Sequence, residues 1–353
     1  MKYPALLPFT EILPHLDQFD AIIDVRSPIE FEEDHIPGAI NCPVLNNEER
    51  KHVGTLYKQV NSFEAKKAGA ALIARNIARH LETLFMDKPR DWKPLIYCWR
   101  GGSRSGSMAH IFAKIGWPAV QLDGGYKEYR RHVNAALAEL PSRFAFQIIC
   151  GTTGSGKSRL LQTLAAQGAQ VLDLEHLASH RGSVLGRLPS APQPTQKSFE
   201  TSIWNTLRHF DTGRMVFIES ESKKVGNLRV PDTLMEKMRT SPCISIALSQ
   251  HDRISLLMQD YAHFVASPEL LNTSLDCLLP LHGREKIARW HSMASSGQME
   301  ALVTELLIAH YDPAYLRSID RNFSEFSKAR KIVLPDISET SFRSAAQYLQ
   351  REQ

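Results

Sequence analysis

The sequence has no long hydrophobic run. None of its uninterrupted apolar stretches approaches the ~20 residues that a membrane-spanning helix needs. Residues 1–14 also contain no basic segment followed by an apolar run, which argues against a signal peptide. We therefore expect a cytoplasmic protein that does not contact a membrane.

Cysteine is also scarce, with five residues in a chain of 353. They are scattered, form no C-x-x-C pair and have no histidine at metal-ligand spacing: Cys42, Cys98, Cys150, Cys243 and Cys277. This distribution argues against a disulfide framework and against a structural zinc site. We expect no tightly bound cofactor, and we expect the four cysteines other than Cys98 to be core residues.

The composition is that of a globular protein, with 43% hydrophobic and 23% charged residues. The length allows two or three domains. The net charge is only +4, but residues 145–250 hold 12 basic and 8 acidic side chains. This local excess is compatible with a phosphate-bearing partner without requiring one.

A glycine-rich loop follows the short apolar run that ends at Tyr97. Its cysteine, Cys98, stands between a predicted strand and an amphipathic helix over residues 108–115. At the start of a helix, backbone N–H groups and the helix dipole lower a thiol pKa and favour the nucleophilic thiolate. We predict an anion cradle from the residues that follow: Trp99, Arg100, Gly101, Gly102 and Ser103.

Arg104, six positions after Cys98, is predicted to bend back and offer a guanidinium fork to an oxyanion. We interpret Cys98 and Arg104 as catalytic residues. The alternative is a buried core cysteine followed by a flexible turn.

The remainder of the N-terminal region indicates an α/β fold. Strands are predicted over 21–26 and 119–122, and residues 35–41 are predicted as a turn into another strand. Helices are predicted over 62–84 and from 126 to about 140. A capped helical turn is predicted at Ser27 to Phe31. Asp24, Arg26, Glu30 and His35 are interpreted mainly as structural ion pairs. The residues Pro141, Ser142 and Arg143 break the pattern and predict a domain boundary.

In order, these motifs resemble a rhodanese domain. The resemblance rests on residues 24–28 with 30–31, residues 35–39, the Cys98 loop and residues 122–126. It implies that Cys98 carries a transferable chalcogen as a persulfide or perselenide. The common sulfurtransferase loop has its arginine five positions after the cysteine, whereas the spacing of six here is that of the C-x5-R rhodanese-like phosphatases. The wider cradle predicts a larger anion, such as a phosphate or selenophosphate.

The second region opens on a predicted strand over 146–150 and continues with the full G-x-x-x-x-G-K-[ST] pattern. The residues of this phosphate-binding loop are Gly151, Thr152, Thr153, Gly154, Ser155, Gly156, Lys157 and Ser158. Backbone N–H groups surround phosphate oxygens, the lysine adds charge, and the final serine is able to bind Mg²⁺. A third strand ends on Glu219 where aspartate is usual, which leaves the magnesium arrangement open. Nothing indicates whether ATP or GTP binds.

We predict three segments: a rhodanese domain over 10–140, a P-loop domain with a parallel sheet over 145–250, and a helical C-terminal region over 251–353. A flap is expected over residues 179–194, and further charge at the ligand edge of the sheet over residues 220–224. Within the last region, residues 332–334 are predicted as a single late strand.

The order of these parts resembles the tRNA 2-selenouridine synthase family along essentially the whole chain. That resemblance implies a tRNA substrate with a wobble 2-thiouridine, whose sulfur is first alkylated with geranyl diphosphate and then replaced by selenium from selenophosphate. The chemistry of the P-loop predicts that it holds this diphosphate, because bound positive charge favours the departure of the leaving group. Trp99 and Trp117 are candidates for packing the prenyl chain, with core packing as the alternative.

Two other functions remain open from the residues. One is a C-x5-R phosphatase or sulfurtransferase fused to a P-loop kinase-like domain. The other is an RNA-binding regulator that is gated by a nucleotide and catalyses no reaction.

Overall fold

The computed structural model describes residues 3–187 and 191–351. The chain divides into two compact units, Met1–Ala136 and Leu137–Gln353. Part of the predicted flap, residues 188–190, lies outside the described residues.

A five-stranded parallel sheet forms the centre of the first unit. Its order is β1-β5-β4-β2-β3. The strands are β1 (Ala5–Leu7), β2 (Ala21–Asp24), β3 (Ala39–Asn41), β4 (Pro94–Tyr97) and β5 (Val120–Leu122). All four residues of the central strand β4 are buried. Because the carboxyl ends of parallel strands meet at one edge of a sheet, the loops after β2, β4 and β5 gather there.

The predicted strands of this unit are confirmed, and β1 is an addition. Its three residues are too short a run for an alternating pattern, and β1 is set by pairing with β5, from Ala5 opposite Val120 to Leu7 opposite Leu122.

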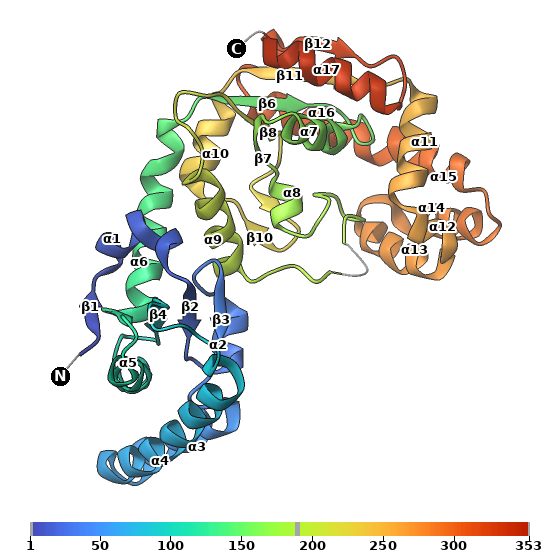
Figure 1. Cartoon of the computed structure of the whole chain (residues 1–353). Coiled ribbons are helices and arrows are strands. Elements are labelled where there is room, and N and C mark those ends of the chain that lie inside the picture. Colours follow the sequence, from blue (N-terminus) through green and yellow to red (C-terminus); the bar gives the residue numbers. More distant parts are fainter. Residues whose placement is uncertain (1–2, 188–190, 352–353) are drawn as a thin grey trace. The chain divides into compact units, whose positions relative to one another are not determined.

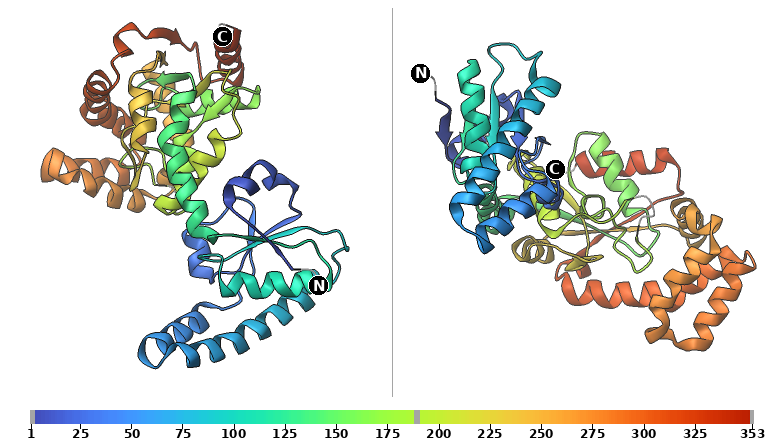
Figure 2. Two further views of the ribbon diagram at one scale, coloured as in Figure 1. Left: turned by 90° about the vertical axis from the view of Figure 1, so that its left-hand side faces the viewer. Right: turned by 90° about the horizontal axis from the view of Figure 1, so that it is seen from below.

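The helices of the first unit are α1 (Phe9–Ile12), α2 (Pro28–Glu33), α3 (Asn47–Gln59), α4 (Ser62–His80), α5 (Ser103–Ile115) and α6 (Gly125–Glu139). The predicted helical turn is α2, which Ser27 and Glu30 close with a reciprocal capping box. The predicted long helix is α4, followed by a π-helical turn, Leu81–Phe85. Figures 1 and 2 show α3 and α4 side by side at one end of this unit.

Aromatic side chains fill much of the first core. Trp117 lies edge-on to Trp92 and to Phe112, with ring centroids 5.0 Å apart in each pair. Its indole N–H donates to the carbonyl of Pro89 over 2.9 Å. Trp117 is therefore a core residue, and the alternative interpretation of this tryptophan is the correct one.

The second unit contains another five-stranded parallel sheet, in the order β12-β11-β6-β8-β7. Its strands are β6 (Phe146–Cys150), β7 (Gln170–Leu172), β8 (Val216–Glu219), β11 (Cys243–Ala247) and β12 (Arg330–Val333). The first strand of the unit, β6, is central, and the chain builds one half of the sheet before it crosses to the other. Ligands bind at such a switch point, beyond the carboxyl ends of the strands.

Helices cover this sheet and extend beyond it. They are α7 (Lys157–Ala166), α8 (Leu174–Leu177), α9 (Gln196–Leu207), α10 (Asp232–Arg239), α11 (Gln250–Asp260), α12 (Ala262–Ala266), α13 (Pro268–Leu275), α14 (Leu279–Ser295), α15 (Met299–Leu306), α16 (Asp312–Asn322) and α17 (Glu339–Arg351). A small hairpin joins β9 (Lys224–Val225) to β10 (Leu228–Arg229).

The C-terminal region contributes to two cores. The predicted late strand is β12, which pairs with β11, and α17 packs against α7 (Figure 1). Both elements therefore complete the sheet domain, although they belong to the segment predicted as helical. A separate apolar cluster lies among the helices from α12 to α15 and includes Phe264, Trp290 and Leu302.

No helix in the described ranges is both long enough and apolar enough to cross a bilayer. Three of the four cysteines expected in the core are buried: Cys42, Cys150 and Cys243. Cys277 is exposed in a 3-10 turn, so that part of the prediction is wrong.

Candidate functional site

Cys98 lies directly after β4, and the loop that follows turns sharply into α5. The loop is held by the segment after β5, because the N–H of Tyr126 donates to the carbonyl of Cys98 over 2.8 Å. Gly101 has a φ of +64°, and a Cβ atom there would lie 2.6 Å from the carbonyl oxygen of Leu122. Glycine is therefore required at this position by both conformation and space. Cys98 itself is only 3% exposed.

A short chain of hydrogen bonds reaches the thiol from inside the unit. The Ser105 hydroxyl donates to the Sγ atom of Cys98 over 3.2 Å. The side-chain amide of Gln121 donates to the Ser105 hydroxyl over 3.1 Å and to the carbonyl of Gly101 over 2.5 Å. These hydrogen bonds fix the position of the sulfur in the loop. The loop thus combines the burial of a core cysteine with polar contacts to its sulfur.

The predicted cradle residues have different surroundings. Trp99 stacks on Tyr126 with ring centroids 5.3 Å apart. Arg100 and Gly102 are exposed, and Ser103 is the first residue of α5. The helix α5 therefore begins five positions after Cys98, and five residues before the segment 108–115 that the amphipathic pattern predicted.

Arg104 faces Glu30 in this structure. Its two terminal nitrogens donate to the two carboxylate oxygens over 2.7 and 3.2 Å. Burial disfavours the charged carboxylate, but the hydrogen bond and charge of Arg104 outweigh it and lower the pKa of Glu30 to about 2. The predicted movement of Arg104 toward an oxyanion would have to break this pair.

Of the four residues interpreted mainly as structural ion pairs, Asp24, Arg26 and Glu30 do form ion pairs. Arg26 and Asp24 form a fully buried pair at 2.6 Å, and Arg26 lies 3.9 Å from the centre of the Tyr126 ring. His35 instead bonds the carbonyl of Phe31 over 2.9 Å. The Arg26 pair fixes the loops after β2 and β5 against each other, beside the Cys98 loop.

The P-loop joins β6 to α7 in the second unit. Lys157, the first residue of α7, reaches back and donates to the carbonyl of Gly151 over 2.7 Å. The Ser158 hydroxyl donates to Glu175 over 3.1 Å. This is the strand, loop and helix context that a phosphate chain requires, with the lysine amine already at the mouth of the loop.

Two side chains from distant helices hold the P-loop from outside. Tyr315 of α16 accepts a hydrogen bond from the N–H of Gly151 over 2.7 Å, and its ring lies 5.4 Å from the Lys157 amine. Arg253 of α11 donates twice to the carbonyl of Thr153, over 2.9 and 2.8 Å, and binds Asp312 with both terminal nitrogens. Neither residue carries a sequence signal, since they lie 164 and 100 positions from their partners.

Four carboxyl groups gather beside Lys157: Asp173, Glu175, Glu219 and Glu221. The N–H of Glu175 donates to Glu219 over 2.9 Å. Burial, reinforced by the charge of Glu221, raises the pKa of Glu175 to about 8. Burial also raises the pKa of Glu219 and of Glu221. Protons therefore remain in this cluster at pH values where carboxyls are usually ionised.

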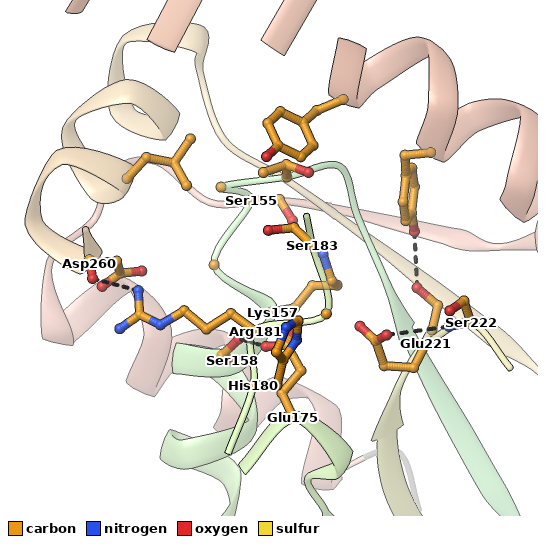
Figure 3. A pocket seen from close by; sticks show the side chains of 18 of the residues that line it. Ser155, Lys157, Ser158, Glu175, His180, Arg181, Ser183, Glu221, Ser222 and Asp260 are labelled. Atoms are coloured by element: carbon orange, nitrogen blue, oxygen red, sulfur yellow. Dashed lines mark hydrogen bonds between the residues drawn. The ribbon is translucent and has the colours of Figure 1, made fainter. Parts of the chain in front are cut away.

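A cavity of about 660 Å³ opens over the P-loop. Figure 3 shows Lys157 and Ser158 on one side of it, with Glu175, His180 and Arg181 close by. Its wall also includes Ser183 from the predicted flap, and Ser220, Glu221 and Ser222 from the segment after β8. Of the charged residues predicted at this sheet edge, Glu221 lines the cavity. Lys223 does not line it and pairs with Asp232 over 2.8 Å.

Two polar clusters thus lie in separate units, and each contains the residues predicted for it. Sequence reasoning missed Ser105 and Gln121 beneath Cys98, and Glu175, Tyr315 and Arg253 around the P-loop. Within the described ranges, no group of three or more His, Cys, Asp or Glu side chains is arranged to hold a metal ion.

Comparisons with known proteins match both units. The model of the rhodanese-like domain matches residues 10–132, and the model of the tRNA 2-selenouridine synthase AAA domain matches residues 144–271. The first unit is therefore a rhodanese domain, and the second contains a parallel-sheet AAA domain with a helical C-terminal region.

Individual relatives match most of the length of this chain. The tRNA 2-selenouridine synthase of Sulfurovum sp. (strain NBC37-1) is 35% identical over 264 residues, which cover 71% of this chain and 70% of the relative. That of Nitrosomonas europaea is 34% identical over 247 residues, 68% of this chain and 63% of the relative, so the match spans less than two thirds of that protein. That of Shewanella halifaxensis is 28% identical over 334 residues, 85% of this chain and 89% of the relative. The chain belongs to the tRNA 2-selenouridine synthase family.

Proposed function

We propose that this protein replaces the sulfur of a tRNA 2-thiouridine by selenium in two transfers, the first using geranyl diphosphate and the second using selenophosphate. The observation that carries the proposal is the presence, in one chain of this family, of a loop-borne cysteine and a large P-loop cavity. Two separate sites in one chain match a reaction that uses two donors, geranyl diphosphate and selenophosphate.

The first transfer belongs to the P-loop cavity. The thiouridine sulfur attacks the carbon of the geranyl group that bears the diphosphate, the bond from this carbon to oxygen breaks, diphosphate leaves, and the N3 proton of the base passes to water. The backbone N–H groups of the loop and the Lys157 amine stabilise the negative charge that grows on the leaving group. Lys157 must exchange its bond to the Gly151 carbonyl for a phosphate oxygen.

Mg²⁺ fits the chemistry of this cavity. Ser158 and Glu175 offer hard oxygen ligands beside the P-loop, and Mg²⁺ usually takes one or two carboxylates together with waters and phosphate oxygens. When bound, the ion neutralises the charge of the diphosphate. Holding Glu175 in its ionised form would then be part of binding the ion.

The second transfer belongs to Cys98. Selenium becomes bonded to C2 of the base, the bond from C2 to the alkylated sulfur breaks, and geranylthiol leaves. Water takes up the phosphoryl group of selenophosphate as phosphate. Ser105 holds the Cys98 sulfur in position for this step, and Arg104 becomes available to the anion once it leaves Glu30. We assign Cys98 and Arg104 to this step, in the cytoplasm.

The decisive experiment is mass spectrometry of tRNA nucleosides after incubation with the full chain, geranyl diphosphate and selenophosphate. We expect S-geranyl-2-thiouridine with geranyl diphosphate alone, and 2-selenouridine with both donors. Cys98→Ser should abolish selenouridine, because a serine hydroxyl does not replace the sulfur to which the second transfer is assigned, and should leave part of the geranylation, which is assigned to the P-loop. Cys277→Ser, at an exposed cysteine, is the matched control.

Unchanged nucleosides would refute the proposal. Release of phosphate from a phosphomonoester without tRNA would favour the C-x5-R phosphatase instead. Tight tRNA binding with no product would favour the nucleotide-gated regulator.

A further inference from the structure

A second, apolar pocket adjoins the phosphate cavity. The two share Thr153, Ser183, Leu257, Tyr261 and Tyr311 in their walls. A ligand bound at the P-loop therefore has a neighbouring space into which a second part of the same molecule can extend. This space lies among α11, α12, α13 and α15, away from the sheet.

The lining of this pocket is apolar away from the shared rim. Met258, Phe264, Leu302 and Val303 contribute to it, and the hydroxyl-bearing residues, Thr153, Ser183, Tyr261 and Tyr311, all belong to the wall shared with the phosphate cavity. A nucleotide base would lose its hydrogen bonds to water there without gaining partners. A hydrocarbon chain would lose none and would gain from leaving water.

We propose that this apolar pocket receives the isoprenoid chain of the prenyl diphosphate while the P-loop holds its diphosphate. This inference rests on the proposed function, which supplies the donor, and adds the site of its chain. The phosphate cavity on one side of the shared wall is polar, and the pocket on the other side is apolar. The two together match a ligand with a charged diphosphate and a hydrocarbon chain.

The size of the pocket favours a short chain. Its free space is about 70 Å³, which at roughly 10–15 Å³ per water-sized site is room for about five to seven such sites. A ten-carbon chain needs the lining side chains to move outward, and a fifteen-carbon chain needs a larger movement. The pocket therefore also selects chain length.

Val303 is the residue to change, because it lines the pocket and is only half-buried, so that a larger side chain is tolerated by the fold. Calorimetric titration of the full chain with geranyl diphosphate and with inorganic diphosphate distinguishes the contribution of the hydrocarbon chain to the affinity from that of the diphosphate. Val303→Phe should weaken geranyl diphosphate about tenfold or more and leave inorganic diphosphate unchanged. Leu281→Phe, at a side chain that is 69% exposed and outside the pocket, should change neither.

Val303→Ala enlarges the same space and should reduce the preference of the protein for geranyl over farnesyl diphosphate. Equal affinity of wild type for geranyl and inorganic diphosphate would overturn the inference, as would a Val303→Phe protein that binds geranyl diphosphate normally. If wild type geranylates tRNA but Val303→Phe does so equally well, only the pocket assignment fails. If no geranylated nucleoside forms while Val303→Phe still weakens geranyl diphosphate selectively, the pocket assignment stands and the proposed function fails.

Discussion

The Ser105 hydroxyl lies within hydrogen-bonding distance of the sulfur of Cys98, with 3.2 Å between the two heavy atoms, and the carbonyl oxygen of Gly102 is a second acceptor at 3.3 Å. The two residues lie seven positions apart, on either side of the turn from β4 into α5. Gln121 of β5 fixes Ser105 from the other side, so the donor does not rotate freely. This arrangement makes Ser105 a positioning residue whose effect passes through the cysteine.

Ser105→Ala should slow the alkylation of Cys98 by iodoacetamide at pH 7 roughly tenfold. A hydrogen bond to a charged group contributes ~1.5–3 kcal/mol, and the Ser105 hydroxyl offers such a bond to the sulfur as it reacts. Peptide mass spectrometry of the alkylated protein measures the rate at Cys98 alone. Ser107→Ala removes a hydroxyl that bonds the Ser103 carbonyl on the same helix and should have no effect. Equal rates in all three proteins would show that Ser105 only fills space.

Because Arg104 and Glu30 form an ion pair, substitutions of the two residues should have opposite effects on the KM for selenophosphate. If Arg104 leaves Glu30 to bind selenophosphate, Glu30→Gln should lower the KM for selenophosphate, since it removes the competing charge but keeps an oxygen for the capping box. Arg104→Ala should raise that KM roughly tenfold, because a charge-assisted hydrogen bond is lost. Ser27→Ala disturbs only the cap of α2 and is the control. A KM that moves in the same direction in both variants would mean that the pair is purely structural.

Lys157→Ala should damage geranylation more than it damages selenation of tRNA that already carries the S-geranyl group. The diphosphate is present only in the prenyl donor, and loss of one charged phosphate contact should slow that step roughly ten- to a hundredfold. The two half-reactions are assayed separately by supplying pre-geranylated tRNA. Lys331→Ala, at an exposed lysine of β12, should leave both rates unchanged. Loss of selenation alone would place selenophosphate at the P-loop instead.

Glu175→Gln should stabilise the ligand-free protein at pH 8 but not at pH 4.5. Burial, together with the charge of Glu221, raises the pKa of Glu175 from its ordinary value of 4.5 to about 8 in the folded chain. Between these values the folded chain binds a proton that the unfolded chain has lost, so the free energy of unfolding falls as pH rises. Glutamine never ionises and avoids this loss.

The difference between the variant and wild type should therefore widen with pH by at most ~1.4 kcal/mol per unit across this window. Urea unfolding at a series of pH values measures it. Glu236→Gln, at an exposed position, should give a difference that does not change with pH. A constant difference for Glu175→Gln as well would mean that the carboxylate is solvated in the folded state.

Local sequence patterns were sufficient to predict the two sites, each of which consists of a strand, a loop and a helix. The Cys98 loop and the P-loop each depend on residues that are neighbours in sequence: a short apolar run, glycines where the backbone must turn tightly, and a helix start. The capping box of α2 was predictable for the same reason, because Ser27 and Glu30 are only three positions apart.

The partners of these sites were decided by tertiary structure. Arg104 is paired with Glu30, 74 positions away, and Tyr315 and Arg253 hold the P-loop from helices that carry no motif. Hydrophobic periodicity shows which face of a helix is buried but not which distant face it meets. For the same reason β12 and α17, predicted within a helical region, complete the sheet domain, and the apolar pocket beside the P-loop exists only where four helices from the C-terminal region converge on it.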